Sequence, residues 1–169
     1  IPITRHAGAS IEDRKALHSL ELKQHLAGLG FNEIISYSLL SEKALKESGW
    51  NDWEAAHKIT NPLSAEQEYF RPWLLTGMLQ IVLFNVHRKT ESLKFFEIGN
   101  RYTAGKEETV LALGLYGYLG YDWKKKDVSN FYDLKGVIEN IMGYFKIKGW
   151  KCMEEKNDLF ENAASIFVD

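Results

Sequence analysis

The sequence predicts an α+β domain in which a mainly antiparallel sheet is flanked by helices. Two stretches, 74–86 and 131–145, carry apolar residues at helical spacing. Between them, 93–102 and 110–121 are apolar runs typical of strands, separated by a polar segment typical of a hairpin tip. The 169 residues are 45% hydrophobic, which suits one folded domain covering 1–169.

The N-terminal third predicts a helix, a strand and a second helix. The first helix is expected over 10–29, because Gly30 supplies a stop signal after the last apolar residue. A strand is expected over 33–39, where larger and smaller side chains alternate. A short helix is expected over 41–49, and the segment 50–57 that follows it is irregular.

The middle of the chain combines a turn with a charged residue in an apolar setting. Asn61 and Pro62 predict the turn, because proline fixes its own φ and keeps the preceding residue out of the α region. Arg71 then lies beside Pro72 and Trp73, where an unpaired charge would be costly. We therefore expect Arg71 to have a partner.

The rest of the chain continues the same pattern. The strand over 93–102 contains Glu97 and Gly99 and leads into a polar hairpin tip, where Glu107 and Glu108 are expected in a solvated turn. The elements expected after it are a strand over 110–121, a charged loop over 121–130, a helix over 131–145 and strands over 150–153 and 164–168.

Composition limits the kinds of site that the chain can hold. A net charge of −2 gives no global field to recruit nucleic acid or an anionic membrane. The single cysteine, Cys152, excludes an internal disulfide, fits a reducing cytoplasm and is expected to be a buried structural thiol. The five histidines show no zinc-ligand spacing, and no apolar run approaches the ~20 residues of a membrane span.

The order of motifs resembles the synthetase-like core module of the bacterial phenylalanyl-tRNA synthetase β subunit. In that family an Asn-Pro-Leu-Ser turn precedes a Leu-Arg-Pro run, a helix and a Phe-Glu-Ile-Gly strand. The matching residues here are Asn61 to Ser64, Arg71, Pro72, Leu74, Leu75, Gly77, Leu79, Asn85, Arg88 and Phe96 to Gly99. The resemblance covers nearly the whole chain and implies a class II synthetase fold. It also implies that 1–169 is a segment of a longer β subunit.

The resemblance implies a module that has kept the fold and lost the reaction. Class II enzymes place an arginine of their second motif against the ATP α-phosphate, where charge accumulates as pyrophosphate leaves. Thr103 stands at the corresponding position and carries no charge. Arg101 is a poor substitute, because neighbouring side chains on a strand point to opposite faces. No counterpart of the third motif is found within 1–169.

The resemblance also implies the partners and cofactors of the complete enzyme. The family forms an (αβ)2 heterotetramer in the cytoplasm that uses ATP and Mg²⁺ to attach phenylalanine to tRNA(Phe). This fragment is expected to pack on the α subunit, to bind no cofactor itself and to be inactive alone. Two alternatives remain at this point: an independently active ligase of class II fold, and a stand-alone RNA-binding module.

Six residues are candidates for a structural or subunit-interface role, and none for catalysis, cofactor binding or metal binding: Asn61, Pro62, Arg71, Trp73, Glu97 and Gly99. For Arg71 the sequence leaves two interpretations open, a structural ion pair with Glu97 or a remnant of the substrate cleft that serves an interface. The structural pair is favoured. The Lys124–Lys126 run after Trp123 is read as an exposed loop rather than an RNA site, because neighbouring acids dilute its charge.

The helix over 74–86 is the expected contact surface. Its apolar residues lie on more than one face, so either the rest of the domain surrounds it or a partner covers one flank. We expect association at or near this helix and the adjoining strand.

Overall fold

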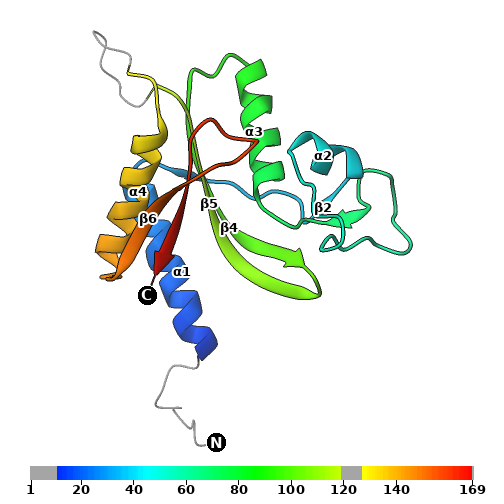
Figure 1. Ribbon diagram of the computed structural model, residues 1–169, viewed down its shortest axis with the longest axis horizontal. Coiled ribbons are helices and arrows are strands. Elements are labelled where there is room, and N and C mark those ends of the chain that lie inside the picture. Colours follow the sequence, from blue (N-terminus) through cyan, green and yellow to red (C-terminus); the bar gives the residue numbers. More distant parts are fainter. Residues whose placement is uncertain (1–10, 119–126, 169) are drawn as a thin grey trace, which may run out of the picture.

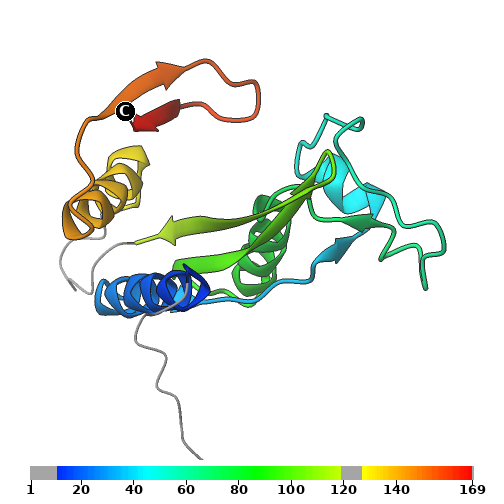
Figure 2. The same ribbon diagram turned by 90° about the horizontal axis from the view of Figure 1, so that it is seen from below.

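The computed structural model describes residues 11–118 and 127–168 of the chain (Figures 1 and 2). Its elements, in order, are α1 (Ile11–Gly28), β1 (Asn32–Glu33), β2 (Leu39–Leu40), α2 (Glu42–Glu47), β3 (Tyr69–Phe70), α3 (Leu75–His87), β4 (Ser92–Thr103), β5 (Lys106–Gly117), α4 (Phe131–Tyr144), β6 (Trp150–Glu155) and β7 (Ala163–Val168). The expected helices, the central hairpin and the two final strands are therefore present.

The described strands form three small sheets. The central sheet has the order β1-β4-β5, with β4 and β5 antiparallel over their full length and β1 parallel to β4. The pairs β2–β3 and β6–β7 are antiparallel and separate from it. The mixed α and β composition and the predominance of antiparallel pairing agree with the predicted class, although the strands do not join one sheet.

The β4–β5 hairpin is the spine on which the helices pack (Figures 1 and 2). On one face lies a buried cluster of three side chains: Leu26 of α1, Phe31 just before β1, and Phe96 of β4. Val137 and Ile141 of α4 pack against this cluster. On the opposite face α3 contacts β5, where Met78 lies against Gly114. An added Cβ at Gly114 would lie 2.8 Å from the Met78 sulfur, so the Met78 side chain would have to shift.

A second cluster holds the short elements together. Leu40, Leu45 and Tyr69 are its buried members, and Trp50 and Trp53 pack against it. The helix α2 begins as predicted at Ser41, whose side chain accepts a hydrogen bond from the Ala44 amide.

Burial is uneven along the chain. All the buried side chains of the described residues lie between Leu26 and Glu97. From Ile98 to Val168 the described side chains are at most half-buried, including those of β5, α4 and the β6–β7 hairpin. The fully buried side chains therefore come from the part of the chain before Ile98, and β5 and α4 add half-buried side chains that pack against them.

The predicted strand over 33–39 is wrong. Only Asn32–Glu33 and Leu39–Leu40 are strands, while Ile35 and Tyr37 are 87% and 81% exposed. The segment between them leaves β4, to which the Ile34 amide still donates, and crosses to β3. The period-two pattern is real, because Ser36 points inward, but its inward residues meet side chains of Arg71 and Glu97 instead of a neighbouring strand.

Candidate functional site

Arg71 is fixed through its main chain before its side chain makes any contact. It directly follows β3, its amide donates to the carbonyl of Ser38, and its carbonyl accepts from the amide of Tyr102. These two bonds place Arg71 between the crossing segment and β4. Its side chain enters the interior and is only 7% exposed.

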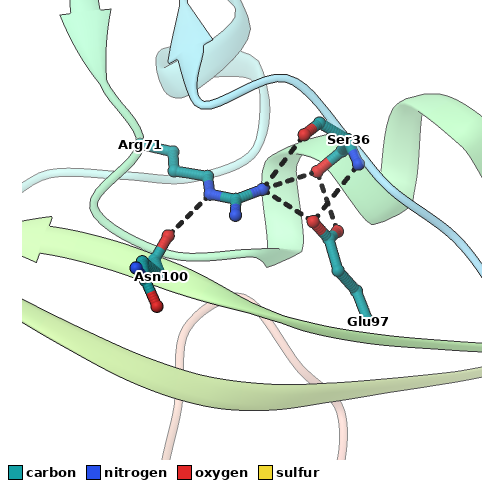
Figure 3. A network of polar contacts seen from close by, with 4 residues as sticks. All are labelled: Ser36, Arg71, Glu97 and Asn100. Carbon is teal, nitrogen blue, oxygen red and sulfur yellow. Dashed lines mark hydrogen bonds and ion pairs between the residues drawn. The ribbon is translucent and has the colours of Figure 1, made fainter. Parts of the chain in front are cut away.

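Three residues from two other parts of the chain meet around this guanidinium: Ser36 of the crossing segment, and Glu97 and Asn100 of β4 (Figure 3). Nη1 of Arg71 donates to Oε1 of Glu97 at 2.7 Å and to Oγ of Ser36 at 3.0 Å, and it lies 3.3 Å from the Ser36 carbonyl. Nε of Arg71 donates to the carbonyl of Asn100 at 2.7 Å. Ser36 in turn donates to Glu97 through its hydroxyl at 2.8 Å and its amide at 3.2 Å.

This cluster of Ser36, Arg71, Glu97 and Asn100, which we call the Arg71 clamp, is a closed network. The Glu97 side chain is 3% exposed, so both members of the ion pair are buried. Burying two charges is costly unless further hydrogen bonds satisfy them, and here both carboxylate oxygens accept bonds. The clamp connects the crossing segment to β4 through side chains, where no strand ladder connects them. The role of the Arg71 clamp is therefore structural.

Two glycines make room for the clamp. A Cβ on Gly99 would collide with Nη2 of Arg71 and lie 3.3 Å from Oε1 of Glu97. A Cβ on Gly77, at the start of α3, would collide with the side chain of Ser36. The glycines are therefore required by the close approach of side chains to the backbone.

The sequence candidates fall into two groups. Arg71, Glu97 and Gly99 come together, and the expected ion pair between Arg71 and Glu97 is present. Trp73 lies just beyond them, where it donates to Oγ1 of Thr76 at 2.7 Å and contacts Trp50 edge to face. The exposed turn residues Asn61 and Pro62 take part in none of the clamp's hydrogen bonds.

Sequence reasoning missed Ser36 and Asn100. The available signal for Ser36 was that two of the three residues on its side of the alternation, Ser36 and Ser38, are polar. Asn100 contributes only its carbonyl oxygen, which every residue carries, so no side-chain pattern could have pointed to it.

The β4–β5 turn is the position at which the resemblance to class II enzymes places the second motif. It consists of only Ala104 and Gly105, both with positive φ (46° and 77°), as in a type I′ hairpin turn. Thr103 forms an antiparallel bridge with Ala56, and the Ala104 amide donates to the Ala55 carbonyl. The turn is thus short and is held by the segment 55–56.

The polar residues near this turn pair with each other. Arg101 binds Glu108 across the hairpin at 2.7 Å, which directs the guanidinium away from Tyr102 as expected. Tyr102 donates to Glu107 at 3.1 Å, and burial, followed by this bond, raises the pKa of the Tyr102 hydroxyl. Glu107 and Glu108 belong to β5, so the expectation of a solvated turn for them is wrong, although both are exposed.

Other chemistry finds little support in the described part of the chain. No three His, Cys, Asp or Glu residues gather there as metal ligands, and no helix there has the length and apolarity to cross a membrane. The expectation of a buried thiol is wrong, because Cys152 is half-buried and the other side chains of β6 are half-buried or exposed. The Lys124–Lys126 run lies outside the described residues.

The helix α3 keeps an open apolar flank. Thr76, Gly77 and Met78 are buried, whereas Leu79, Leu83 and Phe84 are 44%, 53% and 55% exposed. The described parts of the chain therefore do not enclose the helix, so of the two alternatives left by the sequence the first is excluded for these residues, and association at this flank stays a prediction.

Comparison with known proteins places these features in a family. A family model described as the phenylalanyl tRNA synthetase beta chain CLM domain matches residues 1–169. The phenylalanine–tRNA ligase β subunit of Carboxydothermus hydrogenoformans is 36% identical over 161 residues, which are 88% of this chain and 20% of that protein. The β subunit of Onion yellows phytoplasma is 36% identical over 129 residues, 75% of this chain and 16% of that protein. The chain thus spans about a fifth of the length of these relatives.

Solved structures identify the fold. The pyrrolysyl-tRNA synthetase PylSc of Desulfitobacterium hafniense aligns with a TM-score of 0.62 at 18% identity, covering 89% of this chain and 54% of that one. At this identity the likeness concerns the fold alone, and it confirms the class II synthetase fold expected from the sequence.

Proposed function

The chain belongs to the phenylalanyl-tRNA synthetase β-chain family, and on that premise we propose that it is a non-catalytic core module of a phenylalanine–tRNA ligase. In this role it supports a catalytic α subunit during the ATP-dependent attachment of phenylalanine to tRNA(Phe). The proposal covers an (αβ)2 assembly in the cytoplasm, with ATP and Mg²⁺ used by the complete enzyme and neither bound by this module.

The observation that carries the non-catalytic role is the closed β4–β5 turn. Adenylate formation requires a cation placed where charge develops on the α-phosphate. Thr103 supplies no charge, and its main chain is bridged to Ala56. The nearest cation on β4, Arg101, is committed to Glu108. The turn of Ala104 and Gly105 is too short to extend a loop over a substrate.

The Arg71 clamp supports the same conclusion. A guanidinium that binds a substrate phosphate or carboxylate must present free N–H groups to it. In Arg71, Nε and Nη1 donate to Asn100, Ser36 and Glu97, which leaves only the N–H groups of Nη2 outside these bonds. The side chain is 7% exposed, so its role is to hold the crossing segment against β4.

Phenylalanine-dependent ATP–pyrophosphate exchange tests the proposal. The chain 1–169 is expected to give no exchange above a no-enzyme control, whereas the full-length β subunit co-expressed with its α subunit is expected to be active. Exchange by 1–169 that survives repurification would instead indicate an independent ligase.

A tRNA titration tests the RNA-binding alternative. Non-specific binding typically reaches only ~10⁻⁴–10⁻⁶ M at physiological salt, and a short basic run gives few phosphate contacts. We expect 1–169 to bind tRNA no better than this. Sub-micromolar binding, lost when Lys124, Lys125 and Lys126 are all replaced by alanine, would favour the RNA-binding module.

A further inference from the structure

The β6–β7 hairpin stands apart from the sheet and from the buried core. Within the described residues its strands pair only with each other, and Figures 1 and 2 show the hairpin running from the side of α4 towards α3 and α2. None of the described residues of this hairpin belongs to either buried cluster. A two-stranded hairpin is marginally stable at best without further packing, so its position depends on the contacts that it makes with other elements.

The tip of the hairpin reaches the end of α2. Gly49 follows the C-cap residue Ser48 and has a positive φ of 85°, which glycine adopts without strain. A Cβ on Gly49 would lie 2.5 Å from Cδ2 and 2.7 Å from Cδ1 of Leu159. The end of the Leu159 side chain therefore occupies the space that the glycine leaves open, although Leu159 is still 51% exposed.

The surface that receives Leu159 is fixed by bonds of its own. Oγ of Ser48 lies 2.6 Å from Oγ1 of Thr76, at the start of α3. Thr76 also accepts a hydrogen bond from Nε1 of Trp73, whose ring meets Trp50 edge to face. The end of α2 and the start of α3 thus form one unit, which we call the α2–α3 junction, and Leu159 rests on it from outside.

The connection between β6 and β7, residues 156–162, is held by few polar contacts. Within the described residues its hydrogen bond is internal, from the Leu159 amide to Oδ1 of Asn157, and all seven residues are exposed. At the other end of the hairpin, a cavity of about 440 Å³ lies between its strands and the start of α4. Phe131, Cys152 and Ala164 are among the residues that line this cavity. The hairpin therefore has room to move as a unit once its tip is released.

We propose that the β6–β7 hairpin is a strap, that the contact of Leu159 with Gly49 is its latch, and that the strap controls solvent access to the cavity and to the Cys152 thiol. In the closed state, Cys152 is half-buried in the cavity wall. In the open state the hairpin leaves the α2–α3 junction, while the Arg71 clamp and both buried clusters stay intact, because none of their members lies in the hairpin. Local opening of this kind is typical of segments with few buried contacts.

The rate at which iodoacetamide alkylates Cys152 tests the strap. The complete β subunit is co-expressed with its α subunit, and alkylation is followed at the Cys152 peptide by mass spectrometry. Leu159→Asp brings a carboxylate to the carbonyl end of α2, where an anion is disfavoured. Gly49→Asn fills the space of the Leu159 side chain with a residue that tolerates positive φ. We expect each substitution to raise the alkylation rate about fivefold or more.

Matched variants separate the latch from general effects of substitution. Leu159→Met keeps the apolar contact, and Leu63→Asp places the same charge on a turn residue that is 95% exposed. Both are expected to leave the alkylation rate within about twofold of the unmodified protein. Because Leu159 and Gly49 form one contact, combining Leu159→Asp with Gly49→Asn should add little to the effect of either alone.

Amide hydrogen exchange in α3 distinguishes opening of the strap from unfolding of the domain. It is measured on the same proteins, and we expect Leu159→Asp to leave the protection of α3 unchanged. An alkylation rate that neither Leu159→Asp nor Gly49→Asn raises overturns the proposal. A rise that is matched by an equal loss of protection in α3 overturns it as well, because the whole domain would then have opened. Neither result bears on the proposed function, which makes no use of the strap.

Discussion

The Nη1 atom of Arg71 lies 2.7 Å from Oε1 of Glu97, and both side chains are almost completely removed from solvent. An ion pair in this position restrains two separate segments, because Arg71 follows β3 and Glu97 lies within β4. Ser36 adds a third segment to the same contact. The consequences of removing the pair can therefore be predicted in some detail.

Arg71→Met is expected to destabilise the chain by about 3–5 kcal/mol, because it leaves the Glu97 carboxylate buried without its cation. Arg71→Lys keeps the charge but cannot reach Glu97 and the Asn100 carbonyl in the same geometry, so it should also be destabilising. Urea unfolding measures both. The control is Arg101→Met, whose exposed pair with Glu108 contributes ~0–1 kcal/mol. Equal losses at Arg71 and Arg101 would contradict a structural role for the clamp.

Gly99→Ala is expected to destabilise the chain by about 1–3 kcal/mol, because the added methyl meets the Arg71 guanidinium in a filled space. Gly136→Ala on α4 is the matched control. No atom lies within 4 Å of its added Cβ, so alanine there should stabilise the helix by up to ~1 kcal/mol. The two substitutions are thus expected to shift the urea midpoint in opposite directions. A shift of the same sign would show that Gly99 is not crowded by Arg71.

Because the pKa of the Tyr102 hydroxyl is raised in the folded state, we expect the free energy of unfolding to fall at alkaline pH. Burial and the bond to Glu107 raise the pKa of its hydroxyl above the ordinary value of 10.0, so the folded state favours the protonated phenol. This stabilisation is complete below pH 10 and is lost as pH rises through the folded pKa. Tyr102→Phe removes it, so the difference in unfolding free energy between the two proteins should narrow above pH 10. A difference that is constant to pH 11.5 would argue against this origin.

Thr103→Arg is expected to leave the chain without ATP–pyrophosphate exchange. The substitution restores a cation at the motif position, but the two-residue turn and the bridge to Ala56 remain. Measurable exchange by this variant, absent from a Thr103→Lys control, would mean that a single side chain separates the module from activity.

Rates of amide hydrogen exchange are expected to differ between the parts of the chain before and after Glu97. Amides in α4 and the β6–β7 hairpin are expected to exchange faster than those of α3 and the N-terminal half of β4, because none of the side chains in α4 or in this hairpin is buried. Uniform protection across α3 and α4 in the isolated chain would contradict this division.

Sequence patterns predicted those features that depend on local periodicity or on nearby turn chemistry. The helices over 74–86 and 131–145 and the hairpin strands follow from apolar spacing, and all are present to within a few residues. The partner of Arg71 was also predictable, because a buried arginine requires a carboxylate and Glu97 was the available acid in the neighbouring apolar strand.

The crossing segment could not be predicted in this way. An alternating pattern over 33–39 has the same appearance whether its inward residues meet a strand or a side-chain network. Only the tertiary position of Arg71 decides between these outcomes, because its guanidinium occupies the space in which a ladder would form. For the same reason the exposure of Ile35 and Tyr37 was not anticipated.

The confinement of burial to residues before Ile98 has a consequence for the order of events during synthesis. A ribosome releases the N-terminal part of a chain first. By the time Asn100 has left the exit tunnel, every member of the Arg71 clamp and every buried side chain of the described residues is already available. The nascent chain can therefore begin to form its buried core before β5 is synthesised and pairs with β4. The helix α4 and the β6–β7 hairpin then pack on a core that has already formed.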